Sequence, residues 1–174
     1  MELVEGRIRL RPLRYSDKEV LVRLANNKKI WDNLRDMFPY PYQVSDAEKF
    51  IDMVKPIEPT LNFSIVYDTD FTGVIGIIRQ HDVYRKSAEI GYWIGEPYWN
   101  MGIATIALKL ATKYAFEELN LERLFAGVFE GNEESKRVLE KCAYQLEGIY
   151  RKAVLKNKKL IDEWRYAKLK GEYL

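Results

Sequence analysis

The chain has 174 residues, enough for one domain spanning residues 1–174 with a self-sufficient core. Its 28 basic and 26 acidic residues are largely interleaved and leave a net charge of +2, which argues against nucleic acid or an anionic membrane as the main partner. One cysteine excludes an intrachain disulfide and a cysteine-based zinc site, and the absence of a signal-like or transmembrane segment predicts a cytoplasmic protein.

The first third of the chain reads as a strand followed by two helices. Residues 7–13 alternate apolar and charged side chains with the period of a strand. Ser16 to Glu19 and Ser45 to Glu48 each have the capping-box pattern, and apolar residues follow both at helical spacing. We therefore expect a helix to begin at each of these serines.

An aromatic segment, residues 31–42, lies between the two helices and cannot form one regular helix, because it contains two prolines. It either forms a wall of a substrate pocket or inserts its aromatic side chains into the protein's own core. Under the first interpretation the candidate substrate-binding residues are Trp31, Asn33, Leu34, Phe38 and Tyr40. Asp32 and Asp36 in this segment either attract a cationic acceptor or are simply solvated.

The rest of the chain alternates strands with two helices. We expect strands at 61–67, 73–79, 88–94, 124–129, 144–150 and 161–169, and helices at 103–119 and 133–142. The unit from 88 to 129 should be a right-handed crossover between parallel strands. The hairpins on either side should be antiparallel, which gives an α+β (mixed α/β) fold with one mixed sheet covered by helices.

The stretch from Glu96 to Thr105 carries the most information about function. It leaves a strand, passes through a loop with a glycine, and enters a long amphipathic helix. A helix N-terminus presents N–H groups without intrahelical acceptors and a positive dipole, and Gly102 and Ala104 keep the approach open for a phosphate. Small residues also begin many helices for packing reasons. The stretch is neither a nucleotide P-loop nor a three-glycine dinucleotide fingerprint.

Four segments follow one another in a distinctive order: Arg9 to Leu13, Ala88 to Trp93, Trp99 to Ala104, and Asn132 to Lys141. Together they resemble the GNAT superfamily of N-acetyltransferases, in its RimJ/RimL-like branch of ribosomal-protein N-terminal acetyltransferases. Trp99 departs from the Gln or Arg that usually opens the pyrophosphate motif. The resemblance covers nearly the whole chain and implies a GNAT-like fold. Such a fold has a mostly antiparallel sheet of six to seven strands, a splayed parallel fourth and fifth strand, and about four flanking helices.

The resemblance also implies acetyl-CoA as co-substrate and no metal ion. The cofactor-binding residues that it implies are Tyr92, Trp93, Ile94, Trp99, Asn100, Met101, Gly102, Ile103, Ala104, Thr105, Asn132 and Ser135. In the family, the pantetheine arm enters the gap between the splayed strands and pairs with strand backbone. Asn132 would contact that arm, or it simply caps the short helix that follows it.

Direct acetyl transfer needs a base for the amine, a polarised carbonyl and a stabilised thiolate. The resemblance implies Glu89 as the general base, acting directly or through water, and its place mid-strand between apolar neighbours is compatible with that role; alternatively it pairs with a cation such as Arg79 or Arg85. Many GNAT enzymes place a tyrosine acid where this chain has Leu139. Ser135 is then the best remaining donor to the thiolate.

Two other reactive side chains have plain interpretations. His81 is the only histidine and reads as a surface residue, and Cys142 reads as a packed core thiol. A homodimer is also considered, with Trp164 and Tyr166 in the final strands as candidate interface residues.

The favoured function is an acetyl-CoA-dependent N-acetyltransferase acting on the α-amine of a protein or peptide. The second hypothesis is an enzyme for a small-molecule amine such as an amino acid, a polyamine or an aminoglycoside. The third, from another class, is a non-catalytic acyl-CoA-binding module. The absence of the tyrosine acid at position 139, which is a leucine, keeps that hypothesis open, whereas Glu89 and Ser135 argue against it. The acceptor and the acyl-chain preference stay open.

Overall fold

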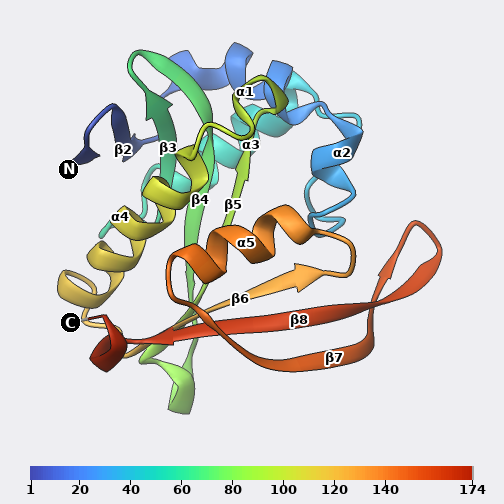
Figure 1. Ribbon diagram of the computed structural model, residues 1–174. Helices are drawn as coiled ribbons and strands as arrows, with labels where there is room; N and C mark the ends of the chain where they lie inside the picture. The colour runs from blue at the N-terminus through green and yellow to red at the C-terminus, as the bar shows by residue number, and fades with distance from the viewer. Residues whose placement is uncertain (174) are drawn as a thin grey trace. The chain divides into compact units, whose positions relative to one another are not determined.

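The computed structural model describes residues 1–173, and its elements alternate along the chain as drawn in Figure 1. The helices are α1 (Lys18–Ala25), α2 (Lys28–Trp31), α3 (Val44–Val54), α4 (Ile103–Glu117) and α5 (Glu133–Lys141). The strands are β1 (Leu3–Glu5), β2 (Ile8–Pro12), β3 (Asn62–Tyr67), β4 (Asp70–Arg79), β5 (Ser87–Ile94), β6 (Arg123–Phe129), β7 (Gln145–Lys156) and β8 (Lys159–Leu169). The described residues also contain four 3-10 turns: η1 (Tyr15–Asp17), η2 (Asp82–Tyr84), η3 (Glu96–Tyr98) and η4 (Lys170–Glu172).

The predicted α+β architecture is confirmed. The strands form one mixed sheet in the order β1-β2-β3-β4-β5-β6-β8-β7, in which β5 and β6 are parallel. Two short elements escape sequence prediction, β1 and α2, and they bring the described residues to eight strands and five helices. They contain 3 and 4 residues, too few positions to display a hydrophobic period.

The chain divides into two compact units. Unit 1 comprises residues 1–76 and 92–110, and unit 2 comprises residues 77–91 and 111–174. Each unit is described by itself, and the single domain expected from the sequence stays a prediction.

Unit 1 combines antiparallel strands with α1 and α3. Strand β2 pairs with β1 and β3, and β3 pairs with β4. The two helices bury one apolar face each, at Leu21 and Leu24 of α1 and at Ala47 and Ile51 of α3, in a cluster that also contains Phe71 of β4. The helical spacing of these apolar residues is what the sequence predicted.

The two helix starts, however, differ from the predicted caps. The chain enters α1 through η1, where the Asp17 carboxylate accepts a hydrogen bond from the Arg14 N–H at 2.8 Å. Helix α3 begins at Val44, and Asp46 accepts from the Gln43 N–H at 2.8 Å. The predicted caps at Ser16 and Ser45 are therefore wrong, because the aspartate that follows each serine bonds the chain entering the helix.

Unit 2 contains the parallel pairing of β5 with β6. Strands β5 and β6 pair in register from Ser87 with Arg123 to Glu89 with Phe125, and β8 pairs antiparallel with both β6 and β7. Helix α5 lies over β6 and β8 in Figure 1. The Tyr166 hydroxyl of β8 donates to Glu140 of α5 at 3.0 Å, which joins the helix to the sheet.

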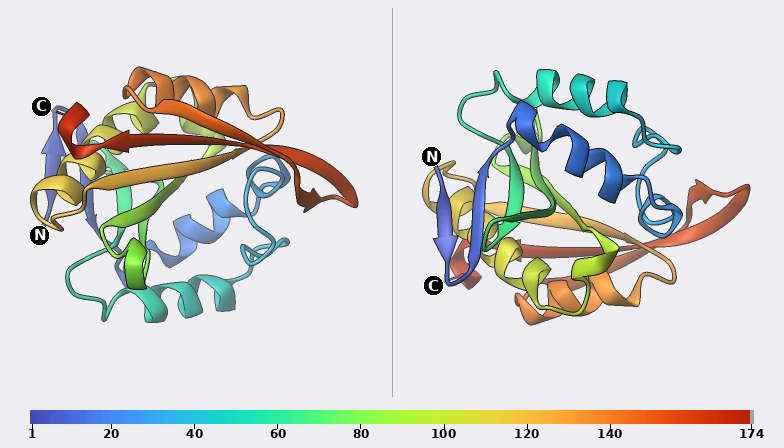
Figure 2. Two further views of the ribbon diagram at one scale, coloured as in Figure 1. Left: turned by 90° about the horizontal axis from the view of Figure 1, so that it is seen from below. Right: turned by 90° about the horizontal axis from the view of Figure 1, so that it is seen from above.

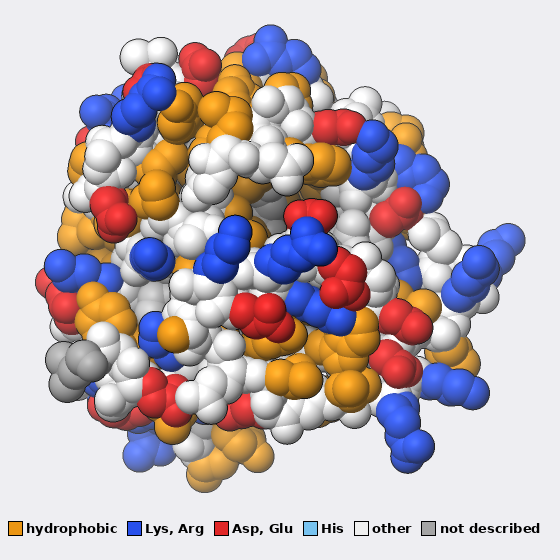
Figure 3. All heavy atoms as spheres, in the orientation of Figure 1, with side chains coloured by type: hydrophobic (Ala, Val, Ile, Leu, Met, Phe, Trp, Pro, Cys, Tyr) orange, Lys and Arg blue, Asp and Glu red, His pale blue; other side chains and the backbone are white. Residues whose placement is uncertain are grey.

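The outer surface of α5 mixes both signs of charge. Glu133 pairs with Lys136 at 2.9 Å and Glu134 with Arg137 at 3.8 Å. Figure 3 shows basic and acidic side chains side by side over this helix, as the balanced composition predicts. No helix among residues 1–173 is both long and apolar enough to cross a membrane.

The β7–β8 hairpin is longer than predicted, and its tip extends beyond β6 and α5 in Figure 2. The predicted strands stopped at Tyr150 and resumed at Ile161, but the pairing continues to Lys156 opposite Lys159. Most of β7 is exposed, so its outer part lacks the alternation that reveals a half-buried strand.

Candidate functional site

The loop that leads into α4 has the open geometry that a phosphate needs. Asn100 and Gly102 adopt φ angles of +63° and +75°, and the Gly102 carbonyl accepts from the Ile106 N–H at 3.3 Å, which makes Gly102 the last residue before the helix. A Cβ added at Gly102 would meet no atom within 4 Å. An anion can therefore approach the first N–H groups of α4, and the residues present fit a pyrophosphate.

Trp99 holds this loop against the end of β5. Its indole N–H donates to the Ile94 carbonyl at 2.7 Å, and the ring is 38% exposed. Met101 is 48% exposed beside it, whereas Ile103 is buried. The residue that departs from the usual family motif thus fixes the loop backbone through its side chain.

Strand β5 supplies the other predicted cofactor contacts in unit 1. Tyr92 and Trp93 are half-buried and Ile94 is buried. The parallel ladder with β6 covers three residue pairs and ends at Glu89, while β5 continues to Ile94. The splay of these strands that the resemblance implies, and the entry of the pantetheine there, stay predictions.

The aromatic segment between α2 and α3 was expected either to form a wall of a substrate pocket or to insert into the core, and its residues differ in this respect. Phe38 packs against Tyr42 and Trp93, with ring centroids 5.0 and 6.0 Å away, and Tyr42 is 5% exposed. Trp31 lies 5.8 Å from Tyr40, which is 44% exposed. Phe38 therefore packs against the core next to Trp93 of β5, whereas Trp31 is half-buried and Tyr40 exposed.

Two further candidate acceptor residues, Asn33 and Leu34, lie in the same segment. Leu34 is half-buried, and the exposed Asn33 donates its side-chain amide to the Lys29 carbonyl at 3.0 Å. Asp32 pairs with Lys28 at 2.6 Å, so a cation of the same helix already balances this carboxylate. Contact of any of these residues with an acceptor stays a prediction.

Glu89 belongs to unit 2, whereas the loop residues 99–102 belong to unit 1. Its neighbours Ala88 and Ile90 are buried, so the alternation of a strand places Glu89 on the opposite face, where it is half-buried. Arg79 donates to the Leu119 carbonyl at 3.5 Å and Arg85 to the Asp82 carbonyl at 3.1 Å. The mid-strand environment expected of Glu89 is present, and its role as base stays a prediction.

Asn132 and Ser135 begin α5, also in unit 2. The Asn132 side-chain oxygen accepts from the Ser135 N–H at 3.3 Å, so Asn132 is the N-cap of this helix, as its plain interpretation had it. Ser135 is half-buried, and the Leu139 side chain is completely buried. The nearby Tyr144 hydroxyl, buried and 2.7 Å from Thr112 Oγ1, belongs to the core.

The sequence did not predict the contact that the Glu96 side chain makes with the start of α2. Its carboxylate accepts from the Asn27 side-chain amide at 2.7 Å and from the Lys29 ammonium. These hydrogen bonds, from Lys29 first and Asn27 second, lower the pKa of Glu96. No local pattern signals the contact, because Asn27 and Glu96 are 69 positions apart.

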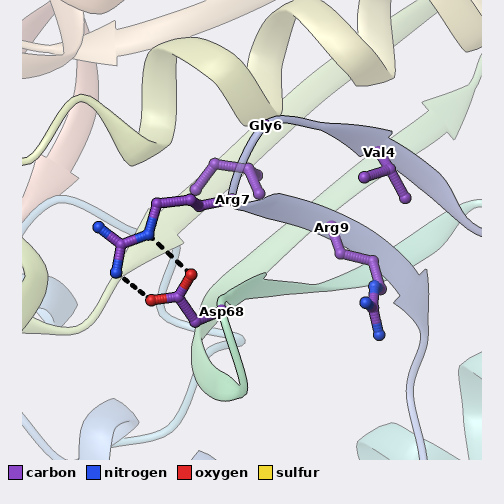
Figure 4. A pocket seen from close by; sticks show the side chains of 6 residues that line it. Val4, Gly6, Arg7, Arg9 and Asp68 are labelled. Carbon is purple, nitrogen blue, oxygen red and sulfur yellow. Dashed lines mark hydrogen bonds and ion pairs between the residues drawn. The ribbon is translucent and has the colours of Figure 1, made fainter.

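The recess drawn in Figure 4 contains none of the predicted site residues. It has a volume of about 210 Å³ and is lined by Val4, Gly6, Arg7, Ile8, Arg9 and Asp68. Arg7 forms two hydrogen bonds with Asp68, one from Nε at 2.7 Å, and both side chains are largely exposed. The recess is therefore a surface notch beside two turns with its charges already paired.

His81 is exposed and Cys142 is buried, as expected. Within residues 1–173, no three His, Cys, Asp or Glu side chains gather in a group that could hold a metal ion.

Comparison with known proteins gives three informative similarities. The sequence profile described as "Acetyltransferase (GNAT) domain" matches residues 7–145. The chain is 31% identical over 98% of its length, and 97% of the relative's, to the uncharacterized N-acetyltransferase p20 of Bacillus licheniformis. It is 29% identical to the spermidine N(1)-acetyltransferase of Escherichia coli K12, over 81% of this chain and 74% of that protein.

A solved structure agrees with these matches in fold. RimL, a ribosomal L7/L12 α-N-protein acetyltransferase in complex with coenzyme A, superposes with a TM-score of 0.85 over 97% of this chain and 98% of that chain. The two sequences are 21% identical, so this similarity shows the fold alone.

Proposed function

Because the chain belongs to the GNAT acetyltransferase family, and is thus an acetyl-CoA-dependent N-acetyltransferase, we propose that its acceptor is the α-amine of a protein or peptide N-terminus. The observation that carries this choice is the charge of residues 28–36, which contain three basic and two acidic residues, with Asp32 already paired to Lys28. A site for a polycation gains from an excess of carboxylates. A peptide with a single ammonium group needs no such excess.

The acetyl donor is held at the start of α4 in this account. The N–H groups that follow Gly102 bind the pyrophosphate, and Trp99 keeps the loop in place. The half-buried Trp31 and the exposed Tyr40 supply apolar surface for the first side chains of the acceptor peptide.

Glu89 accepts the proton that the acceptor ammonium must lose, directly or through a water molecule. The freed amine attacks the thioester carbonyl, the carbon–nitrogen bond forms, and the carbon–sulfur bond breaks. Ser135 donates a hydrogen bond to the departing thiolate. The nitrogen loses its extra proton as the amide forms, and the thiolate takes up one proton, so that CoA leaves as the free thiol. No covalent enzyme intermediate is required, so the buried Cys142 has no part in the reaction.

The second candidate acceptor is a polyamine, favoured by the similarity to a spermidine N(1)-acetyltransferase. An assay that measures release of the CoA thiol distinguishes the peptide acceptor from the polyamine acceptor. The assay compares peptides with a free N-terminus, the same peptides with a blocked N-terminus and an internal lysine, and spermidine. We expect turnover with the free peptides only. Turnover with spermidine at a higher kcat/KM than any peptide would reject the α-amine assignment.

A further inference from the structure

Glu96 lies directly before the cofactor loop and is rigidly placed. The Gly95 N–H donates to the Thr72 carbonyl of β4 at 2.7 Å, and the Tyr98 and Trp99 N–H groups close η3 on Gly95 and Glu96 at 2.9 and 3.2 Å. These bonds fix the backbone that carries the Glu96 carboxylate on the same turn that leads into residues 99–102.

The partners of Glu96 lie at the start of α2. Asn27 donates its side-chain N–H to one carboxylate oxygen at 2.7 Å, and the Lys29 ammonium donates to the other. We call this set of three residues the Asn27–Lys29–Glu96 bridge. Because the hydrogen bonds from Lys29 and then Asn27 lower the pKa of Glu96, the carboxylate is charged at neutral pH.

Asn27 links this bridge to the backbone of α2. Its side-chain oxygen accepts from the Lys29 N–H at 2.9 Å, and its carbonyl accepts from the Ile30 and Trp31 N–H groups at 3.1 and 3.0 Å. Both ends of the Asn27 amide are thus used, which fixes its orientation. Helix α2 has four residues, far fewer than a helix needs to persist without outside contacts.

Helix α2 ends at Trp31, the first residue of the segment proposed to contact the acceptor. The Trp31 ring lies 5.8 Å from Tyr40, and the Lys28 ammonium lies 5.5 Å over the same ring. The position of this aromatic pair therefore depends on a one-turn helix that is held at its N-terminal end by Glu96.

We propose that Glu96 is a positioning residue that holds the acceptor-contacting segment in a fixed place relative to the cofactor loop, an inference that rests on the function proposed above. An exposed ion pair alone contributes little to stability, and the Glu96 side chain is 39% exposed. Its effect is expected in the geometry of α2, where the Asn27 hydrogen bond adds direction to the charge.

The test compares Glu96→Ala and Glu96→Gln with the wild-type protein, and uses Glu48→Ala as the matched control. Glu48 pairs with Lys18 at 2.9 Å between α3 and α1, and its side chain has a similar exposure of 46%. Glu96→Gln keeps an oxygen for the Asn27 amide but loses the charge that faces Lys29, so it should fall between Glu96→Ala and wild type.

The first measurement is amide hydrogen exchange of the protein without ligand. Residues 30–34 bond to carbonyls three or four positions earlier, and their exchange should be about tenfold faster in Glu96→Ala than in wild type or Glu48→Ala. Unchanged exchange of these amides in Glu96→Ala overturns the proposal. This result does not depend on acetyl transfer, so it separates the bridge from the proposed function.

The second measurement compares the kinetic constants for the peptide with the dissociation constant of acetyl-CoA. In Glu96→Ala the peptide KM should rise about tenfold and kcat should fall, while the acetyl-CoA dissociation constant stays within about twofold of wild type. A merely destabilising change would not separate the two substrates in this way. An equal loss of acetyl-CoA affinity would overturn the proposal, because Glu96 would then serve the cofactor loop alone. Failure of wild type to acetylate any peptide rejects the proposed function, and the exchange result still decides whether Glu96 holds α2.

Discussion

Two carboxylates of unit 1 show how strongly the surroundings of a residue decide what it contributes. Asp17 is 5% exposed and bonds to Arg11 at 2.6 Å, to the Arg14 N–H at 2.8 Å and to Ser64 at 3.1 Å. Asp68 pairs with Arg7 in the open, with its side chain 44% exposed. Burial raises the pKa of Asp17, but the hydrogen bonds from Arg11, Arg14 and Ser64 outweigh it and the net pKa is lowered.

The buried pair should therefore matter to stability and the exposed pair should not. Asp17→Asn leaves the charge of Arg11, whose side chain is 12% exposed, without its carboxylate partner, and we expect the free energy of unfolding to fall by about 3 kcal/mol at neutral pH. Asp68→Asn is the control, because asparagine tolerates the φ of +54° at this position. Urea unfolding of both variants checks the expectation, and equal effects would contradict it.

The difference between wild type and Asp17→Asn should also depend on pH. The folded-state pKa of Asp17 is lower than its ordinary value of 3.8, so the stabilisation is complete above that value and is lost as the pH falls through the lowered pKa. Urea midpoints measured from pH 6 down to the acid limit should therefore converge below about pH 4. Midpoints that stay equally far apart at all pH values would show that Asp17 is not the titrating group.

The catalytic proposal also belongs to single residues. Glu89→Gln should lower kcat at least about 100-fold, because a general base of this kind contributes about that factor or more. Its acetyl-CoA dissociation constant should be unchanged, since the carboxylate is not assigned to the cofactor. Calorimetry and CoA release measure the two quantities, with Glu48→Gln as control. A Gln variant with full activity would remove Glu89 from the mechanism.

At the scale of elements, hydrophobic periodicity in the sequence located the amphipathic helices and the half-buried strands. The first residues of α1 and α3 instead depend on hydrogen bonds from the entering chain to Asp17 and Asp46. The open loop before α4 was predictable because its residues are contiguous and include Gly102, whose φ of +75° favours glycine; its binding of the cofactor stays a prediction. The Asn27–Lys29–Glu96 bridge was not predictable, because its partners lie far apart in sequence. The outer part of β7 was not predicted because both of its faces are largely exposed, and its sequence therefore lacks the alternation of apolar and polar residues that marks a half-buried strand.

The tip of the β7–β8 hairpin offers a test at this scale. Asn157 and Lys158 have φ angles of +51° and +61°, the left-handed pair of a two-residue hairpin turn. Lysine is unfavourable there, so Lys158→Gly should stabilise the protein by about 0.5–1 kcal/mol. Asn157→Gly should gain less, since asparagine tolerates this region. Thermal unfolding of both variants decides, and an equal or lower midpoint for Lys158→Gly would contradict the account.

At the scale of the whole molecule, the balanced composition argues against nucleic acid and anionic membranes as main partners, and it does not identify a substrate. Balanced charge is consistent with the mixed surface of α5, and family membership establishes acetyl-CoA as co-substrate. The acceptor depends on a few residues of one irregular segment, which composition does not describe. Acetyl-CoA that binds only the folded state should also raise the unfolding midpoint as its concentration rises.

The most direct test of the account is calorimetric titration of acetyl-CoA into wild type, Gly102→Trp and Gly6→Trp. Both glycines have positive φ angles, +75° and +57°, and open space where a Cβ would stand, but Gly6 lies in the β1–β2 turn. We predict roughly micromolar binding by wild type and Gly6→Trp, and none by Gly102→Trp. Binding of equal strength by Gly102→Trp, or none by wild type, would contradict the assignment of the loop before α4 as the acetyl-CoA site.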